Sequence, residues 1–219
     1  MSASQAAALL LADGRLPTGG HAHSGGAETA VATGAIRTVQ ELREFCQGRL
    51  HTIGSTAAAL AAAAAHGADL TDLEAEADAR TPSPALRATS RRLGRQILRT
   101  ARHLWWCKRL DAAAALPHGP HHPVVVGCLA DAAGLAPREA ARLAAVDSIT
   151  TPAAAAIRLL GLDPFQVHGV LAGLASEADA VAEEAAAGAA AGRLSSRAAP
   201  LLDFYAEQHH TMEVRLFAS

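Results

Sequence analysis

The spacing of apolar residues between Val39 and Leu60 is the feature of this sequence that most constrains its fold. Apolar side chains recur there every three or four residues, at Val39, Leu42, Cys46, Leu50, Ile53, Ala57 and Leu60. That spacing places them on one face of an α-helix. Thr38 and Glu41 have the spacing of a capping box and predict the first turn of this helix. A long helix therefore begins here, and Gly54 is a position where it can bend.

The composition extends this expectation to the whole chain. Half of the 219 residues are apolar but only 3% are aromatic, and alanine and leucine dominate. Alanine has the highest helix propensity, so the chain is expected to be all-α, and its length suffices for one hydrophobic core. We predict a single-domain helical bundle of roughly eight to ten helices over residues 1–200. A tail over residues 201–219 follows a linker, 188–200, that is rich in Gly, Ala and Ser.

Local signals predict several helix boundaries. Asp13-Gly14 ends a first helix over 3–12, and Thr71 with Glu74 forms a second capping-box sequence. Three prolines mark helix starts in the positions where proline is favoured, at Pro84, Pro137 and Pro164. Pro152 is expected to break or kink the helix that contains it. The linker predicts that residues from about Arg193 onward are mobile until a partner binds them.

Charge and cysteine content narrow the function classes. The formal net charge is −2, which favours neither nucleic acid nor a membrane surface as a partner. The three cysteines, Cys46, Cys107 and Cys128, are far apart, which is typical of a reduced protein. The N-terminal apolar run lacks preceding basic residues, and the alanine run 57–65 is too short to span a bilayer. We therefore expect a cytoplasmic protein.

Basic residues are concentrated in one segment. Nine of the nineteen lie between Arg80 and Arg109, a window without any acidic residue. Arg87, Arg91, Arg95, Arg99 and Arg102 fall on one helical face. Two interpretations remain open, a solvated helix face and a docking stripe for an acidic partner. Nucleic acid is the weaker third option because no aromatic residues alternate with the arginines.

The stretch RLPTGGHAHSGGAE, residues 15–28, combines four glycines with two histidines. It lacks the GxxxxGK[ST] pattern of a phosphate-binding loop, so nucleotide binding by this chain is not expected. Glycine permits backbone angles that other residues avoid. The stretch is therefore interpreted as a tight loop that leads into a helix, with Ser24 as a possible N-cap and Glu28 in the first turns.

Histidines suggest metal binding only weakly. His21 and His23 have no nearby cysteine or carboxylate cluster that completes a coordination shell. His209 and His210 are the other candidates, and His209 with Glu213 has the i, i+4 spacing of a shared metal on a helix. Imidazole binds nickel, zinc and copper. We predict no tightly bound cofactor and no catalytic residue, and no known reaction follows from the spacing.

Several segments together resemble the UreF family of urease accessory proteins. The opening stretch matches the family's LPxGG signature, although His21 replaces the usual aromatic residue and Ala22 the usual serine. Further similar segments are 33–36, 92–98, 122–127 and 157–159, and the tail 212–219 is similar to the family's RLFxS ending with a shorter spacing before the arginine. The resemblance spans nearly the whole chain.

The resemblance implies an all-α scaffold rather than an enzyme. Family members bind a UreD/UreH-type accessory protein and the GTPase UreG, control GTP hydrolysis and support nickel delivery to apo-urease. The resemblance thus implies nickel in transit rather than a tightly bound cofactor. They tend to form homodimers. The expected partner-binding residues are Pro17, Gly19, Gly20, Ser24, Gly26, Glu28, Arg158, Arg215, Leu216 and Phe217.

Two other hypotheses stay open at this point. The chain is alternatively a small helical nickel-binding carrier that uses its own histidines, or a helical enzyme with an unidentified site. Leu216 and Phe217 at a free end are costly to expose, which favours docking of the tail into a partner.

Overall fold

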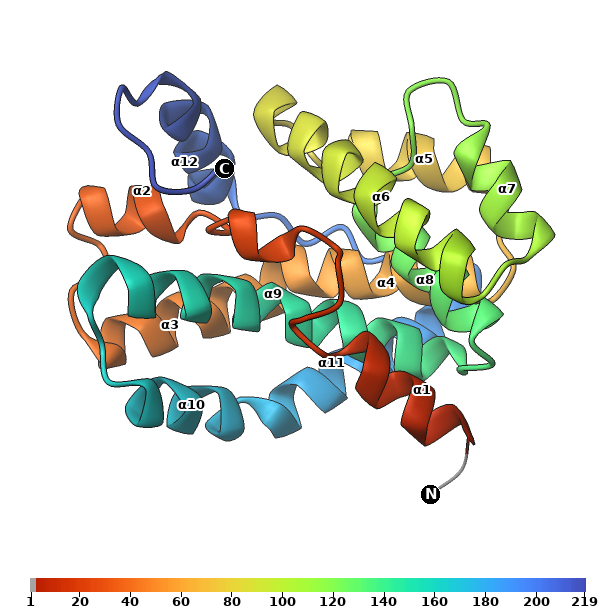
Figure 1. The fold of residues 1–219 in the computed structure, drawn as a ribbon, viewed down its shortest axis with the longest axis horizontal. Helices are drawn as coiled ribbons and strands as arrows, with labels where there is room; N and C mark the ends of the chain where they lie inside the picture. The colour runs from red at the N-terminus through yellow and green to blue at the C-terminus, as the bar shows by residue number, and fades with distance from the viewer. Residues whose placement is uncertain (1–2) are drawn as a thin grey trace.

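The computed structural model describes residues 3–219, and in that range every regular element is helical (Figure 1). The α-helices are α1 (Ala3–Leu11), α2 (Ala27–Ala32), α3 (Val39–Arg49), α4 (Ser55–Ala65), α5 (Leu70–Ala79), α6 (Pro84–Leu104), α7 (Lys108–Ala114), α8 (His122–Ala132), α9 (Pro137–Leu160), α10 (Pro164–Gly173), α11 (Ala175–Ala190) and α12 (Pro200–Thr211). A 3₁₀ turn, η1 (Gly20–Ala22), and a π-helical turn, η2 (Leu50–Gly54), complete the list. The predicted all-α fold is confirmed. Short helices such as α2 and α7 bring the number of helices among the described residues slightly above the predicted eight to ten.

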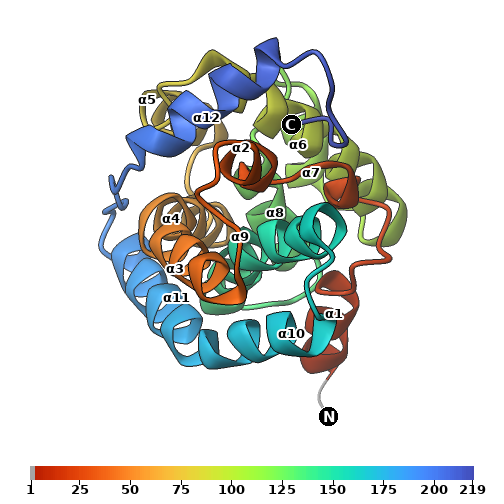
Figure 2. The same ribbon diagram turned by 90° about the vertical axis from the view of Figure 1, so that its left-hand side faces the viewer.

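Helices α4 and α9 form the centre of the core. Both lie in the middle of the molecule, with α8 and α11 packed against them (Figure 2). Alanine dominates these contacts, and its small side chain allows the helix backbones to approach closely. Gly127 on α8 shows how close, because a Cβ atom there would lie 2.2 Å from the Ala61 carbonyl oxygen of α4. The alanine-rich composition therefore produces tight helix packing without many aromatic residues.

Several predicted boundaries are confirmed by their hydrogen bonds. The Thr38 hydroxyl accepts from the Glu41 amide, and the Glu41 carboxylate accepts from the Thr38 amide at 2.9 Å, which completes the capping box of α3. Ser83 caps α6 and Asp163 caps α10. The second predicted capping box is wrong, because Asp69 caps α5 and its carboxylate accepts from the Thr71 and Asp72 amides.

Pro152 lies inside α9, yet the helix continues through it to Leu160. Proline has no N–H, so the carbonyl four residues earlier, that of Ser148, loses its helical donor. The Arg49 side chain supplies a replacement, because its Nε donates to the Ser148 carbonyl oxygen at 2.8 Å. Burial lowers the pKa of Arg49 to about 10. The expected break is therefore absent, and the half-buried Arg49 satisfies the carbonyl that proline leaves unpaired.

One helix among the described residues, α9, is long and apolar enough to cross a membrane by length and composition. It packs in the core against α4, α8 and α11, so its apolar character is explained by burial. The two ends of the described chain lie on opposite sides of the molecule. The N-terminal helix α1 lies at one edge, whereas the C-terminus lies beside α2 on the opposite side (Figure 1).

Candidate functional site

The glycine-rich stretch folds into the 3₁₀ turn η1 and a tight loop before α2. Gly19 and Gly26 adopt left-handed backbone angles, with φ of 78° and 88°, which glycine tolerates best. The predicted N-cap is displaced by two residues, because Gly26 caps α2. The Ser24 hydroxyl accepts from the Gly26 amide at 3.3 Å and stabilises the loop instead.

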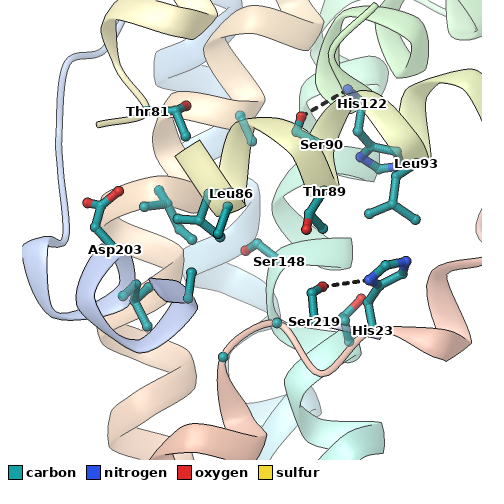
Figure 3. Close-up of a pocket in the computed structure, with 18 of the residues that line it drawn as sticks. His23, Thr81, Leu86, Thr89, Ser90, Leu93, His122, Ser148, Asp203 and Ser219 are labelled. Carbon is teal, nitrogen blue, oxygen red and sulfur yellow. Dashed lines mark hydrogen bonds between the residues drawn. The ribbon is translucent and has the colours of Figure 1, made fainter. Parts of the chain in front are cut away.

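The C-terminal residues pair with this loop in an extended arrangement. The Ser24 amide donates to the Ser219 carbonyl oxygen at 2.6 Å, and the Ala218 amide donates to the Ala22 carbonyl oxygen at 2.8 Å. The Nδ1 atom of His23 lies 2.6 Å from the Ser219 hydroxyl oxygen (Figure 3). We call the contacts between residues 22–28 and residues 214–219 the tail latch. Residues 214–219 therefore contact their own chain in this structure, and the expected mobility of residues from about Arg193 onward in solution stays a prediction.

Glu28 is the centre of the tail latch. Its carboxylate accepts from the Leu216 amide at 2.6 Å and from the Phe217 amide at 3.2 Å. A third contact joins its Oε2 to the Nε2 of His209 on α12, at 2.7 Å. Burial raises the pKa of Glu28, but the hydrogen bonds from Leu216, His209 and Phe217 outweigh it and the net pKa is lowered. Glu28 is therefore ionised at neutral pH and binds the tail backbone.

Phe217 anchors the tail through its side chain. Its ring is only 5% exposed and packs against Ala27, Ala155 and Leu159. The Arg158 guanidinium lies over this ring at 4.5 Å from the centroid, and its Nη1 donates to the His21 carbonyl oxygen at 3.2 Å. Such a contact joins a cation to the face of an aromatic ring. Arg158 therefore connects α9, the loop and the tail.

The expected partner-binding residues divide into buried and exposed sets. Ser24 and Glu28 are buried and face the tail, so they do not present side chains to a partner in this structure. Phe217 is buried within the chain as well, contrary to the expectation that only a partner would cover it. Exposed or half-exposed positions include Pro17, Gly20, Arg215 and Leu216. The surface formed by these positions is the remaining candidate for partner contact.

A cavity of about 1000 Å³ opens between α6, α12 and the tail latch (Figure 3). Leu86 and Leu93 of α6 contribute apolar surface, whereas His23, Ser148 and Ser219 contribute polar atoms. Burial lowers the pKa of His23 to about 4, and the nearby Arg92 adds to that effect. His23 is therefore a neutral imidazole at pH 7. The tail forms part of the cavity wall.

The predicted metal candidates do not come together. Residues 3–219 contain no group of three or more His, Cys, Asp or Glu side chains arranged to hold a metal ion. His21 and His210 are exposed, whereas His23 contacts Ser219 and His209 contacts Glu28. The expected His209–Glu213 pair on a helix is wrong, because α12 ends at Thr211.

A buried polar network beside α6 was not expected from the sequence. His121 contacts the Asp78 carboxylate at 3.0 Å and the Ser90 hydroxyl at 2.9 Å, and its amide donates to the Glu74 carboxylate at 2.8 Å. Arg91 pairs with both carboxylates. These residues come from three separate segments, so local spacing carried no signal for their contact. The network fixes the loop before α8 against α5 and α6.

The fold and the site together define an all-α protein whose C-terminal tail is latched to a glycine-rich loop near its N-terminus. Comparison with known proteins then gives the family. A UreF family model matches residues 36–175, and the chain belongs to this family. A urease accessory protein UreF of Mycobacterium sp. strain JLS is 42% identical over 217 residues, covering 96% of this chain and 97% of the relative.

Two further relatives give the same result. The urease accessory protein UreF of Mycolicibacterium vanbaalenii is 42% identical over 220 residues, and the comparison covers 99% of each chain. The protein of the same name from Mycobacterium tuberculosis strain H37Rv is 40% identical over 217 residues, again with 99% of each chain covered. These names are those of an accessory protein. The resemblance stated from the sequence motifs is therefore confirmed.

Proposed function

We propose that this protein is a scaffold for urease maturation that binds a UreD/UreH-type accessory protein and a UreG-type GTPase. In this role it supports nickel delivery to apo-urease and controls when the GTPase hydrolyses GTP. The observation that carries the proposal is the similarity to urease accessory proteins over almost the whole chain. The tail latch adds a physical basis, because it positions exposed side chains next to the glycine-rich loop.

The exposed edge of the tail is the proposed partner contact. Val214 is 84% exposed and Leu216 is 57% exposed, and they are close in sequence to the exposed Arg215. Leu201 and Phe204 on α12 are also mostly exposed, at 58% and 62%. Exposed apolar side chains that form a contiguous patch, unlike a single exposed one, are typical of protein-binding surfaces. Nickel is cargo in this proposal, and the cytoplasmic location and the homodimer stay predictions.

Co-purification tests the proposal. Tagged full-length protein is mixed with the UreD/UreH-type protein and the UreG-type GTPase of the same organism, and retained partners are quantified. Leu216→Gln is expected to weaken retention of at least one partner, because it removes an apolar side chain from the contact. Phe165→Gln on α10 is the matched control, since Phe165 is 89% exposed and lies on a different helix.

Urease activation provides the second readout. Cells that express urease and the other accessory proteins, but not this chain, should gain nickel-loaded urease when the chain is supplied. Failure of the wild-type chain to bind either partner and to activate urease refutes the scaffold. A stoichiometric nickel site in equilibrium dialysis of the isolated chain, without partner binding, supports the carrier hypothesis instead.

A further inference from the structure

The arginines of α6 form two sets with different surroundings. Arg91 points toward α5, is 14% exposed and pairs with Glu74 at 3.1 Å and with Asp78 at 2.8 Å. Arg87 lies 3.9 Å from the same Asp78 carboxylate. The charges of these two arginines are therefore paired with carboxylates of the buried network. Of the five arginines expected on one helical face, Arg87 and Arg91 therefore differ from the other three by pairing with carboxylates of α5.

The second set, which we call the outer arginine stripe, consists of Arg92, Arg95, Arg99 and Arg102. All four are exposed and line a groove of about 640 Å³ between α6 and the loop that follows α7. Arg92 donates to the Thr89 hydroxyl at 3.3 Å and Arg95 to the His118 carbonyl at 3.2 Å. Within residues 3–219 only Arg102 of the four has a carboxylate partner, Asp111 at 2.8 Å.

This arrangement is unfavourable in the isolated chain. Neighbouring members of the stripe are three or four residues apart, so like charges face one another along the helix and destabilise it. The formal net charge of −2 shows that the stripe is a local feature rather than part of a basic protein. Carboxylates elsewhere in the chain pair with other arginines, such as Arg138 and Arg142. An external anion would relieve the repulsion and use the unpaired guanidinium groups.

We propose that the outer arginine stripe binds an acidic segment of a protein partner. Guanidinium groups bind carboxylates in a bidentate manner, and from Arg92 to Arg102 the stripe runs about 15 Å along α6, which suits several acidic side chains in succession. Trp106 is 64% exposed at its end, where its Nε1 donates to Asp111, the partner of Arg102. Arginine and tryptophan are each enriched among the residues that contribute most to binding at protein interfaces.

Other occupants fit the stripe less well. Binding to single-stranded nucleic acid uses aromatic side chains between the basic ones, and the stripe itself has none. A second copy of the chain whose two-fold axis passes through the stripe would place the same arginines opposite one another. The inference does not rest on the proposed role in urease maturation, because it identifies the partner only by its acidic chemistry.

Binding of a fluorescein-labelled peptide of repeated Glu-Glu-Ala units tests the inference by fluorescence anisotropy. The full chain is compared with the triple variant Arg92→Gln, Arg95→Gln, Arg99→Gln. The matched control is the triple variant Arg37→Gln, Arg43→Gln, Arg193→Gln, which removes the same charge from exposed arginines elsewhere. The stripe variant should bind about tenfold more weakly, and the control should stay within about twofold of wild type.

Two further readouts make the test decisive. The stripe variant should melt at the same or a higher temperature than wild type, because it loses like-charge repulsion. Its loss of binding is then not a loss of folding. The inference is overturned when wild type does not bind the acidic peptide, when both triple variants lose binding equally, or when labelled DNA of the same charge binds the stripe more tightly than the peptide.

Discussion

Substitution of Glu28 by glutamine should release the C-terminal tail. The carboxylate accepts two backbone hydrogen bonds, from Leu216 and Phe217, in addition to its contact with His209. Glutamine keeps one acceptor oxygen and replaces the other with an NH₂ donor, so at least one charge-assisted bond is lost. Each such bond contributes about 1.5–3 kcal/mol. We expect tail docking to weaken by about that amount.

Hydrogen exchange measures this effect directly. A loss of about 1.5–3 kcal/mol should raise the exchange rates of the Leu216 and Phe217 amides by roughly tenfold to a hundredfold, while core amides of α4 keep their protection. Glu213→Gln is the control, because Glu213 is exposed in the same tail. Equal exchange of the two tail amides in Glu28→Gln and wild type would refute the assignment of Glu28 as the residue that holds the tail.

The same carboxylate predicts a pH dependence. Because the folded-state pKa of Glu28 is lowered from its usual value of 4.5, its contribution is fully present above pH 4.5. It is lost as the pH falls from there through the folded-state pKa. The tail amides of wild type should therefore lose protection in that acidic range, whereas Glu28→Gln should show a flatter dependence.

Two further predictions concern the cavity wall. Arg49→Met should lower the free energy of unfolding by about 1–3 kcal/mol, because it leaves the Ser148 carbonyl unpaired. Urea denaturation should show a smaller loss in a Pro152→Ala background, where the backbone donor is restored, and an equal loss in both backgrounds contradicts this account. His23 has a folded-state pKa near 4 against 6.5 when unfolded, so its contribution to stability should fall as the pH drops from 6.5 to 4. The melting temperature of His23→Asn should decline less than that of wild type over this range, with exposed His21→Asn as the control. If the melting temperatures of wild type and His23→Asn fall in parallel with pH, His23 is not a buried neutral imidazole.

The helical architecture was predictable because its signals are local. The Thr38 capping box, the Ser83 N-cap and the Asp163 N-cap each depend on residues within one helical turn. The apolar spacing from Val39 to Leu60 likewise identified buried positions, including Leu42 and Cys46. The bend expected near Gly54 corresponds to a π-helical turn, which widens the helix without ending it.

The contacts of the site were not predictable because they join distant segments. Glu28 and Leu216 are 188 residues apart, and nothing in the spacing of either segment requires the carboxylate to face the tail. The same reason explains Pro152, whose expected break depends on whether a donor reaches the Ser148 carbonyl. Arg49, which supplies that donor, lies 99 residues earlier. Sequence signals identified Glu28, Leu216 and Pro152 but neither Arg49 nor the pairing of these residues.

The tail latch changes how the two signature segments are to be understood. Ser24 and Glu28 are buried against the tail, and Phe217 is buried against the loop. Their polar atoms form hydrogen bonds within the chain. In the proposed function, these buried residues therefore affect a partner only through the position that they give to Leu216 and Arg215. Substitution of a buried member changes the fraction of molecules with a docked tail, which scales the apparent affinity of any partner that needs the docked form. Substitution of the exposed Arg215 or Leu216 changes the proposed partner contact itself. The residues of the two signature segments therefore have two separable roles, to dock the tail and to contact a partner.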